Sequence, residues 1–276
     1  MPFTRPLISV QDLADLMSNE KVAIVDCRFT IGGDREAGRR AYLAGHIPGA
    51  VYFHLDEDMA APPGEHGGRH PLPDPADFAA RLGAAGIGPG VKVVAYDDAG
   101  APAPRFWWLL RYFGHDDVAV LDGGFKAWTA AGLPVSTEVP APVTGITFVP
   151  KPRPEMVASM EELRDRPLDV AVIDSRSPER FAGKPHPMDE RSGHIPGAIN
   201  HFYMDSLTPD GTMRPAEEQA ARFAGLDPQR TIVYCGSGVT ACTNLLAMEV
   251  AGQKGARLYV GSWSDWCSYP DNPVER

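Results

Sequence analysis

The pattern of hydrophobic and polar positions predicts short buried strands that alternate with helices. In the first half of the chain, largely apolar runs typical of strands occupy 22–25, 51–53, 91–96 and 118–121. Helical spacing of apolar residues lies between them, at 12–17, 35–44, 77–85 and 105–113. Alternation of this kind is typical of a parallel sheet with helices on both faces. The sequence therefore predicts an α/β fold in which each mainly parallel sheet is flanked by helices.

Two sequence motifs occur twice at the same separation. Asp26-Cys27-Arg28 recurs as Asp174-Ser175-Arg176, and the hexapeptide GHIPGA at Gly45–Ala50 recurs letter for letter at Gly193–Ala198. Both second copies lie 148 positions after the first. Self-similarity at a fixed offset indicates internal duplication. The chain is therefore predicted to contain two copies of one structural unit.

A third repeated motif shows that the two copies differ in length. The segment 121–128 (LDGGFKAW) corresponds to 259–266 (YVGSWSDW) at an offset of 138 positions. An offset that shortens by ten positions between motifs indicates an insertion in the first copy. We place this insertion in the segment 60–70.

A proline-rich stretch separates the two copies. Residues 134–154 contain six prolines and no helical period, a composition typical of an extended linker. The predicted organisation is an N-terminal domain at 1–135, a linker at 136–154 and a C-terminal domain at 155–276.

Composition narrows the possible partners and compartments. The 276 residues carry a net charge of −10, which argues against nucleic acid or an anionic membrane as a partner. The four cysteines are scattered and have no zinc-like spacing, so we expect neither a metal nor another cofactor, and a reduced, cytoplasmic protein. The N-terminus lacks the apolar core of a signal peptide, and no run of about 18 apolar residues predicts a membrane span.

The loop around Cys235 is the strongest candidate for chemistry. A β-favouring run ends just before Cys235, glycines follow at 236 and 238, and a helical pattern extends over 239–250. Loop glycines let backbone N–H groups converge, and the positive end of a helix favours an anion at the same point. This setting favours the thiolate, which is the nucleophilic form of cysteine. A buried structural cysteine is the alternative, and the flanking glycines make it the weaker interpretation.

The two copies are not chemically equivalent. The offset of 138 positions places Asp97 in the first copy where the second copy has Cys235. The first domain is therefore predicted to be catalytically inactive. His46 and His194 occupy the same position in the two copies of the hexapeptide. Since the first copy has no thiol, a shared histidine favours a structural role in a turn.

Together these residues resemble the two-domain rhodanese family of sulfurtransferases. The resemblance covers the whole chain and rests on the paired Asp-x-Arg and GHIPGA motifs and on the aromatic motifs that end each copy. The loop Cys235–Ala241 (CGSGVTA) is similar to that of the 3-mercaptopyruvate branch, whereas Arg and Lys typically follow the cysteine in the thiosulfate branch. The resemblance implies tandem rhodanese-like domains and a cysteine persulfide intermediate.

The residues suggest how the loop would act. Cys235 would take a sulfur atom from a small-molecule donor and pass it to a thiol, cyanide or thioredoxin-like acceptor, which is two-step covalent catalysis. A thiolate and a persulfide anion both need N–H donors nearby. The loop after Cys235 is expected to provide them at Gly236, Gly238, Val239, Thr240 and Ala241.

Further site residues are implied by the resemblance. Arg180 matches a substrate-binding arginine of the family, and a guanidinium suits a carboxylate. Ser237 could donate a hydrogen bond to the leaving oxygen, and Asp56 and His70 match an Asp and a His that support this serine in the branch. An exposed loop imidazole is the alternative for His70. A second substrate arginine of the branch has no clean match, and Arg191 is the nearest candidate.

The same residues bear on three other functions. A phosphatase of the same fold needs a Cys-x5-Arg loop, and Ala241 stands where that arginine would be, which excludes it. A thiosulfate:cyanide sulfurtransferase would use the same thiol with another donor. A non-catalytic persulfide carrier would keep the thiol without donor recognition, against which Arg180 and Ser237 count.

Overall fold

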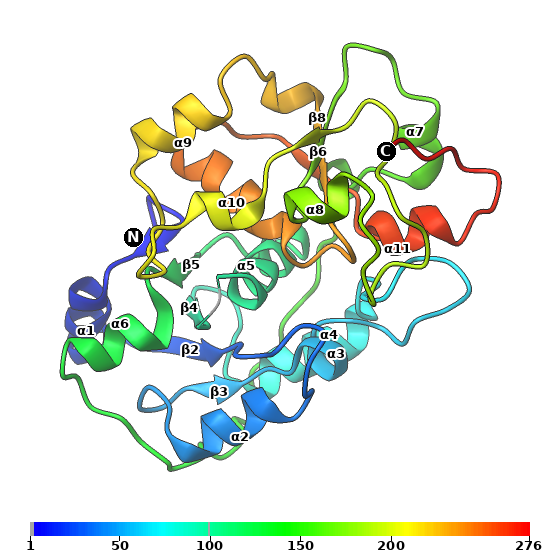
Figure 1. Ribbon diagram of the computed structural model, residues 1–276. Coiled ribbons are helices and arrows are strands. Elements are labelled where there is room, and N and C mark those ends of the chain that lie inside the picture. The colour runs from blue at the N-terminus through cyan, green and yellow to red at the C-terminus, as the bar shows by residue number, and fades with distance from the viewer. Residues whose placement is uncertain (1–2, 99) are drawn as a thin grey trace. The chain divides into compact units, whose positions relative to one another are not determined.

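Short buried strands form two parallel sheets in the structure, a computed structural model that describes residues 3–98 and 100–276 (Figure 1). The chain divides into two compact units. The first unit comprises Met1–Ala60, Pro73–Pro152 and Pro209–Thr212. The second comprises Ala61–Leu72, Arg153–Thr208 and Met213–Arg276. The predicted α/β class with mainly parallel sheets is confirmed.

The first unit contains a five-stranded sheet in the order β1-β5-β4-β2-β3, in which all pairs are parallel. Its strands are Leu7–Ile8 (β1), Val22–Asp26 (β2), Val51–Tyr52 (β3), Lys92–Tyr96 (β4) and Val118–Leu121 (β5). Its helices are Val10–Asn19 (α1), Ala37–Ala44 (α2), Leu55–Asp58 (α3), Pro75–Ala84 (α4), Pro102–Tyr112 (α5) and Gly124–Ala130 (α6). The short β1 and α3 have no counterpart among the elements expected from the sequence.

The second unit contains a four-stranded parallel sheet in the order β7-β6-β8-β9. Its strands are Ala171–Asp174 (β6), Ile199–Asn200 (β7), Thr231–Tyr234 (β8) and Arg257–Leu258 (β9). Its α-helices are Met160–Arg164 (α7), Pro178–Phe181 (α8), Ala216–Arg222 (α9), Ala241–Val250 (α10) and Ser262–Cys267 (α11). Short 3₁₀ turns occupy Pro154–Met156 (η1), Tyr203–Ser206 (η2) and Pro228–Arg230 (η3).

The two sheets repeat one topology. The order β7-β6-β8-β9 matches β3-β2-β4-β5, and the counterpart of β1 is reduced to one parallel bridge between Val157 and Leu258. In each sheet the two central strands end on a paired aspartate and tyrosine, Asp26 with Tyr96 and Asp174 with Tyr234. The residue that follows each tyrosine therefore leaves the sheet at its carboxyl edge.

The duplicated motifs contact each other within each unit. Arg28 forms an ion pair with Asp26 at 2.6 Å and donates a hydrogen bond to the carbonyl of Gly45, the first residue of the hexapeptide. Arg176 does the same with Asp174 at 2.6 Å and with the carbonyl of Gly193 at 2.7 Å. Both arginines are buried, so their charges need these partners. The two motifs therefore recur because each buried guanidinium joins them.

One hydrophobic cluster of the second unit includes residues of its sheet and of the C-terminal helix α11. Trp263 and Trp266 of α11 are almost completely buried and pack with the strands. The other buried members of this cluster are Ala158, Met160, Leu163, Val172, Ile195, Ala198, Ile232, Tyr234, Tyr259 and Cys267. This packing holds the beginning of α11 close to the carboxyl end of β8.

The segment Ala61–Leu72 belongs to the second unit although it lies within the first sequence copy. The backbone N–H of Gly67 donates to Asp265 at 2.7 Å, and the ring of His66 stacks on Tyr269 with centroids 4.0 Å apart. Gly68 has a φ of +78°, and a Cβ there would lie 2.3 Å from the carbonyl oxygen of Gly261. This close approach of two backbones requires glycine at position 68.

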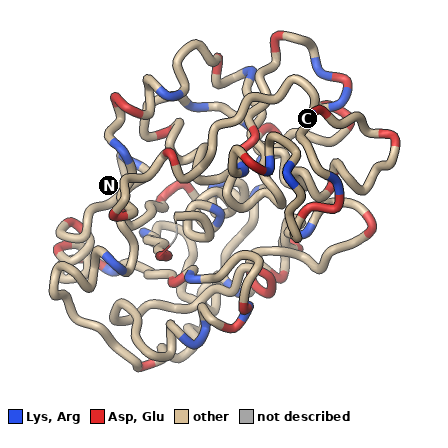
Figure 2. Tube along the Cα trace, in the orientation of Figure 1, with Lys and Arg blue, Asp and Glu red and all other residues tan. Residues whose placement is uncertain are grey.

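Basic and acidic side chains are interspersed along the trace of both units (Figure 2). Within the part of the chain that the structure describes, no helix is both long and apolar enough to cross a membrane.

Candidate active site

Cys235 is the first residue after β8, at the carboxyl edge of the sheet of the second unit. It is buried, with 2% of its surface exposed, and its sulfur accepts a hydrogen bond from the N–H of Gly238 at 3.2 Å. Its own N–H donates to Ser262 Oγ at 3.1 Å, and its carbonyl accepts from the N–H of Trp263 at 2.9 Å. The backbone of the cysteine is therefore fixed by the start of α11.

Ser262 holds this arrangement in an uncommon backbone conformation. It is the one non-glycine residue with positive φ, at 55°, among the residues that the structure describes. Its hydroxyl donates to the carbonyl of Tyr259 at 2.9 Å while accepting from Cys235. Such conformations cost about 1–3 kcal/mol and gather at functional sites. The position of Ser262 beside Cys235 follows this tendency.

The loop after Cys235 exposes several backbone donors to one place. The sequence predicts a helix from position 239, and in the structure this helix, α10, begins two residues later at Ala241. Across the described residues, the N–H groups of Val239, Thr240 and Ala241 have no hydrogen-bond acceptor. Gly238 has a φ of +77°, and a Cβ there would lie 2.4 Å from the carbonyl oxygen of Val260. The loop therefore needs glycine at 238 and leaves N–H donors free for an anion.

Ser237 and His70 form a buried hydrogen-bonded pair. Nδ1 of His70 lies 2.7 Å from Oγ of Ser237, and the two residues are 9% and 4% exposed. His70 reaches Ser237 from the segment Ala61–Leu72. Asp56 lies in the first unit, on α3, where its carboxylate forms an ion pair with Nε of Arg35 at 2.6 Å.

Arg180 is held against a buried carboxylate. Its Nε and Nη2 donate to the two oxygens of Asp189 at 2.7 and 2.5 Å. Burial tends to raise the pKa of Asp189, but the hydrogen bonds and charges of Arg180, together with Arg176, lower it below the usual value. A Cβ built on Gly236 would lie 3.0 Å from Nη2 of Arg180. The predicted arginine therefore reaches the loop beside Cys235.

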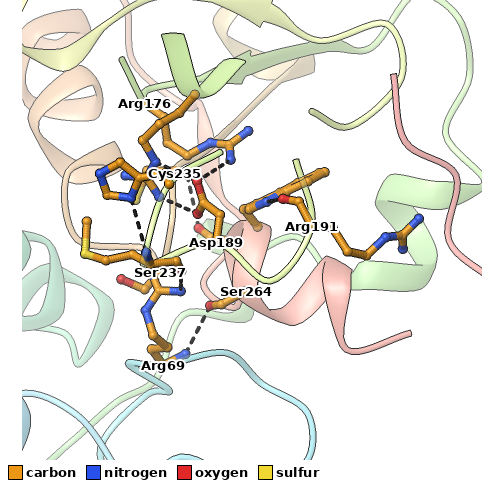
Figure 3. Close-up of polar contacts among 12 residues, drawn as sticks. Arg69, Arg176, Asp189, Arg191, Cys235, Ser237 and Ser264 are labelled. Atoms are coloured by element: carbon orange, nitrogen blue, oxygen red, sulfur yellow. Dashed lines mark hydrogen bonds and ion pairs between the residues drawn. The ribbon is translucent and has the colours of Figure 1, made fainter. Parts of the chain in front are cut away.

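Arg69 is a further cation at the loop that the sequence did not single out. A Cβ built on Gly236 would lie 2.9 Å from its Nη2, and its Nη1 donates to the carbonyl of Met188 at 2.8 Å. Figure 3 shows Arg69 in the same group of side chains as Cys235, Ser237 and Asp189. The only signal in the sequence was the insertion that carries this residue, and an insertion does not show where it packs.

Arg191 takes a structural position. Its Nη2 donates to the carbonyl of Asn272 at 3.0 Å, and its own carbonyl accepts from Nε1 of Trp263 at 2.9 Å. Figure 3 shows its guanidinium directed away from Cys235.

Asp97 of the first unit corresponds to Cys235, because it is the first residue after β4 as Cys235 is the first after β8. Oδ1 of Asp97 accepts from the N–H of Gly100 at 2.6 Å, and Oδ2 accepts from those of Ala101 and Ala103 at 3.0 and 2.8 Å. The loop after Asp97 lacks the glycine spacing of the loop after Cys235, but its N–H groups also point to one place. In the first unit a side-chain carboxylate occupies that point.

The other three cysteines are buried in different settings. Burial raises the pKa of the Cys27 thiol well above its usual value, and the charges of Asp26 and Asp97 add to this. Burial also raises the pKa of Cys267, to about 11. Sγ of Cys242 donates to the carbonyl of Gly238 at 3.3 Å. Cys27 and Cys267 therefore remain protonated thiols near neutral pH.

One cluster in the first unit has the spacing of metal ligands. Glu36, His54 and Glu57 each place one ligand atom within 4.8 Å of the others. Arg39 already pairs with both glutamates, at 3.2 and 2.6 Å. Nδ1 of His54 accepts backbone N–H bonds, and its Nε2 lies 3.2 Å from the carbonyl of Arg35. These contacts account for the cluster without a metal ion.

Comparisons with known proteins agree on one family. The sequence model of the Rhodanese-like domain matches residues 9–131 and 157–269. A Pseudomonas aeruginosa protein named "Probable 3-mercaptopyruvate sulfurtransferase" is 41% identical over 278 residues, which cover 97% of each chain. The thiosulfate sulfurtransferase of Bos taurus is 35% identical over 95% of this chain and 92% of its own. The structure of 3-mercaptopyruvate sulfurtransferase from Leishmania major matches with a TM-score of 0.83 at 30% identity, over 94% of this chain and 73% of that one.

Proposed function

The chain belongs to the rhodanese family and is a two-domain sulfurtransferase, and we propose that it takes sulfur from 3-mercaptopyruvate through a persulfide on Cys235. The observation that carries the choice of donor is the hydrogen bond between Ser237 and His70, two residues after the thiol. Thiosulfate has no carbonyl oxygen for this pair to bind, whereas a mercapto-keto acid does.

The first half of the reaction moves one sulfur atom to the enzyme. The Cys235 thiolate attacks the sulfur of 3-mercaptopyruvate and forms an S–S bond. The carbon–sulfur bond breaks, and its electron pair leaves with carbon 3 as the enolate of pyruvate. A proton added to that carbon completes pyruvate, and Cys235 is left as the persulfide. The reaction needs no external oxidant or reductant, because carbon 3 keeps the electron pair of the carbon–sulfur bond and is reduced while the two sulfur atoms are oxidised to the persulfide level.

Ser237 and His70 are assigned to the carbonyl oxygen of the donor. Negative charge develops on this oxygen as the carbon–sulfur bond breaks, and a hydroxyl donor placed there stabilises it. His70 orients the hydroxyl through the 2.7 Å contact, and both groups are buried, which strengthens the interaction. Asp56 is proposed as a support for His70 on the family resemblance alone.

The backbone loop is assigned to the sulfur anion. The N–H of Gly238 donates a hydrogen bond to the sulfur of Cys235. The N–H groups of Val239, Thr240 and Ala241 follow in the chain, at the N-terminus of α10. Gly236 adds no side chain to the loop, and the ends of the Arg69 and Arg180 side chains lie beside it. Neutral N–H donors suit a thiolate and a persulfide, because they stabilise the anion without a proton that it could remove.

The second half of the reaction regenerates the thiolate. A nucleophilic acceptor attacks the outer sulfur of the persulfide, the S–S bond breaks, and its electron pair returns to Cys235. A small thiol, cyanide or a thioredoxin-like protein has the required nucleophile. The two halves share only the persulfide, so ping-pong kinetics are expected.

Thiosulfate is the second candidate donor, and one observation favours it. Gly236 and Ser237 themselves carry no positive charge, but Arg69 and Arg180 both reach Gly236. Two cations at this place suit a compact dianion as well as a carboxylate. Kinetics of Ser237 and His70 variants with both donors separate the two candidates, because only the keto acid develops an enolate oxygen for this pair to stabilise.

The test compares the two donors on one enzyme. Intact-mass measurement should show Cys235 one sulfur atom heavier after 3-mercaptopyruvate, and kcat/KM for this donor should exceed that for thiosulfate. Cys235→Ser should abolish transfer, while Cys242→Ser, whose hydroxyl can still donate to Gly238, should keep most of it. A larger kcat/KM for thiosulfate would reject the donor assignment, and turnover by Cys235→Ser would reject the thiol.

A further inference from the structure

Asp265 of α11 carries a buried carboxylate that binds two separate parts of the second unit. The hydroxyl of Tyr259 donates to its Oδ2 at 2.7 Å, and the N–H of Gly67 donates to its Oδ1 at 2.7 Å. The residue is 6% exposed, and across residues 3–98 and 100–276 no Lys, Arg or His nitrogen lies within 4.0 Å of the carboxylate. Burying a charge without a counter-ion is costly. The stability of the fold therefore does not explain this carboxylate.

The N-terminus of α11 is built like that of α6 in the first unit. Gly124 begins α6 and Ser262 begins α11, with positive φ values of 58° and 55°. The N–H of the next residue donates to the carbonyl of Asp97 at 3.0 Å in the first unit and to that of Cys235 at 2.9 Å in the second. The two helices therefore start in the same conformation.

The first unit reaches this conformation without a carboxylate. At the offset of 138 positions, Tyr259 and Asp265 correspond to Leu121 and Ala127. A polar, hydrogen-bonded pair in the copy with the thiol thus replaces an apolar pair in the copy without it. The difference indicates that Asp265 serves the site rather than the helix.

Asp265 fixes the loop that carries His70. This loop is closed at its base by a hydrogen bond from the N–H of Ala61 to the carbonyl of Pro71, at 3.3 Å. Compact loops with adjacent ends are frequently functional. Gly67 precedes His70 by three positions, so at most about 10 Å of chain separates the residue that Asp265 binds from the imidazole. Movement of Gly67 would therefore be passed on to His70.

Two neutral contacts hold the same loop against α11. The N–H of Arg69 donates to Oγ of Ser264 at 3.1 Å, as Figure 3 shows, and Nδ1 of His66 lies 2.7 Å from Oγ of Ser268. A hydrogen bond to a charged group is about twice as strong as one between neutral groups. Among these contacts, the bond to Asp265 is therefore the one expected to contribute most to the position of the loop.

We propose that Asp265 is a positioning residue that sets His70 against Ser237. The inference rests on the proposed function, in which this pair acts on the carbonyl oxygen of a keto-acid donor. Asp265 acts through the N–H of Gly67 rather than by contact with the donor. A displacement of about 1 Å in a reacting geometry can lower a rate about 10²-fold, so a modest movement of the loop is sufficient for a measurable effect.

The test compares two substitutions of the carboxylate. Asp265→Ala removes both acceptor oxygens, and kcat for 3-mercaptopyruvate should fall about tenfold, in the lower range of a lost charged hydrogen bond. Asp265→Asn keeps the shape of the side chain, because its oxygen can accept from Gly67 and its amide can donate to the hydroxyl oxygen of Tyr259. This variant should stay within about threefold of the wild type, since the loop needs an acceptor in this place rather than a charge.

Two kinetic readouts separate the positioning of His70 from general support of the fold. In Asp265→Ala, kcat for thiosulfate should change little, because sulfite leaves without a carbonyl oxygen for His70 and Ser237 to act on. Asp265→Ala combined with His70→Gln should be no slower with 3-mercaptopyruvate than His70→Gln alone, since both changes disturb one pair.

A third readout requires no donor. In protein labelled with nitrogen-15 at histidine, the ring signals of His70 are identified in NMR spectra by their loss in His70→Gln. These signals should shift in Asp265→Ala and stay in place in Asp265→Asn. The ring signals of His201, which follows β7, should stay in place in both variants.

Two further variants complete the design. Asp227→Ala removes an exposed carboxylate that accepts the N–H of Gln229 at 3.0 Å, and it should leave all three readouts unchanged. Tyr259→Leu combined with Asp265→Ala introduces the apolar pair with which the first unit folds. It tests the same loss without leaving a buried hydroxyl unpaired. Circular dichroism during thermal unfolding shows whether each variant is folded.

Two outcomes would overturn the proposal. Ring signals of His70 that stay in place in Asp265→Ala would mean that the carboxylate does not position the imidazole. Equal falls in kcat with both donors would mean that Asp265 supports the Cys235 loop instead. If the wild-type enzyme failed to use 3-mercaptopyruvate but the signals of His70 still shifted, the donor assignment would be wrong and the positioning role of Asp265 would stand.

Discussion

Nδ1 of His70 lies 2.7 Å from Oγ of Ser237, although 167 positions separate the two residues in the chain. The contact forms because the segment that carries His70 packs on the second unit. An insertion in the first sequence copy thus brings both an imidazole and the Arg69 guanidinium to the edge of the sheet where Cys235 lies.

The first prediction concerns this pair. His70→Gln and Ser237→Ala should each lower kcat for 3-mercaptopyruvate, by about 10²-fold if the pair acts on the developing enolate. Thiosulfate turnover should change far less, because its leaving sulfite has no carbonyl oxygen. Steady-state kinetics with both donors test this, and the double variant should be little worse than either single one. Equal losses with both donors would show that the pair only supports the loop.

The second prediction concerns Asp97, whose carboxylate lies in the loop of the first unit that corresponds to the Cys235 loop. Three N–H groups donate to it, and the side chain is only 5% exposed. Asp97→Asn should destabilise the protein by about 3 kcal/mol or more, since each hydrogen bond to a charged group contributes about 1.5–3 kcal/mol. Urea unfolding measures this loss.

Asp97→Cys tests whether the same loop can do chemistry. The N–H groups of Gly100, Ala101 and Ala103 converge on position 97 although the loop lacks the glycine spacing of the Cys235 loop. We still expect no persulfide at position 97, because Pro102 in α5 has no N–H at the position where the Cys235 loop has that of Thr240. Mass analysis of Asp97→Cys combined with Cys235→Ser after donor exposure decides the matter, and added sulfur at position 97 would contradict the prediction.

The duplication, and the place of Cys235 at the carboxyl edge of its sheet, could be predicted from the sequence for a physical reason. A buried arginine needs fixed partners, so Arg28 with Gly45 and Arg176 with Gly193 keep the same two motifs at the same spacing. A parallel sheet gives apolar strands a distinct pattern, and the thiol follows directly on one of them. These features depend on residues that are neighbours in sequence or repeat in it.

The rest of the site could not be read in this way. Arg69 lies beside Gly236 only because Gly68 lets its segment approach the backbone of Gly261. The pairing of Arg180 with Asp189 depends on a turn whose path the sequence does not show. Convergent N–H groups around Asp97 arise from backbone direction, which residue types alone do not determine. Contacts between distant segments are the part that required the structure.

The third prediction concerns pH. The pKa of Asp189 is lower in the folded protein than its usual value, because its bonds and charges with Arg180 and Arg176 outweigh burial. A carboxyl group with a depressed folded pKa stabilises the protein above its unfolded pKa, near 4, and this contribution is lost as the pH falls through the folded value. Stability should therefore decrease below about pH 4, and Asp189→Asn should flatten this dependence.

Urea unfolding from pH 7 to acid checks the dependence. Asp169→Asn is the matched control, because this aspartate is exposed and pairs only at the surface with Arg230. The control should keep the acid slope of the wild type. If Asp189→Asn keeps it as well, the ion pair with Arg180 does not contribute to acid stability.

The last prediction adds one methyl group to the loop. In Gly236→Ala the new Cβ would lie 2.9 and 3.0 Å from the ends of the Arg69 and Arg180 side chains. Both are ends of long side chains, so they can move aside at little cost in stability, but the space between them narrows. We expect an unfolding midpoint close to that of the wild type, unchanged alkylation by iodoacetamide, and a kcat/KM for 3-mercaptopyruvate reduced about tenfold, as a weakened charged hydrogen bond implies. A methyl group at 236 that leaves kcat/KM intact would place the carboxylate elsewhere, and combining it with Arg69→Gln should add little if the two changes disturb one binding site.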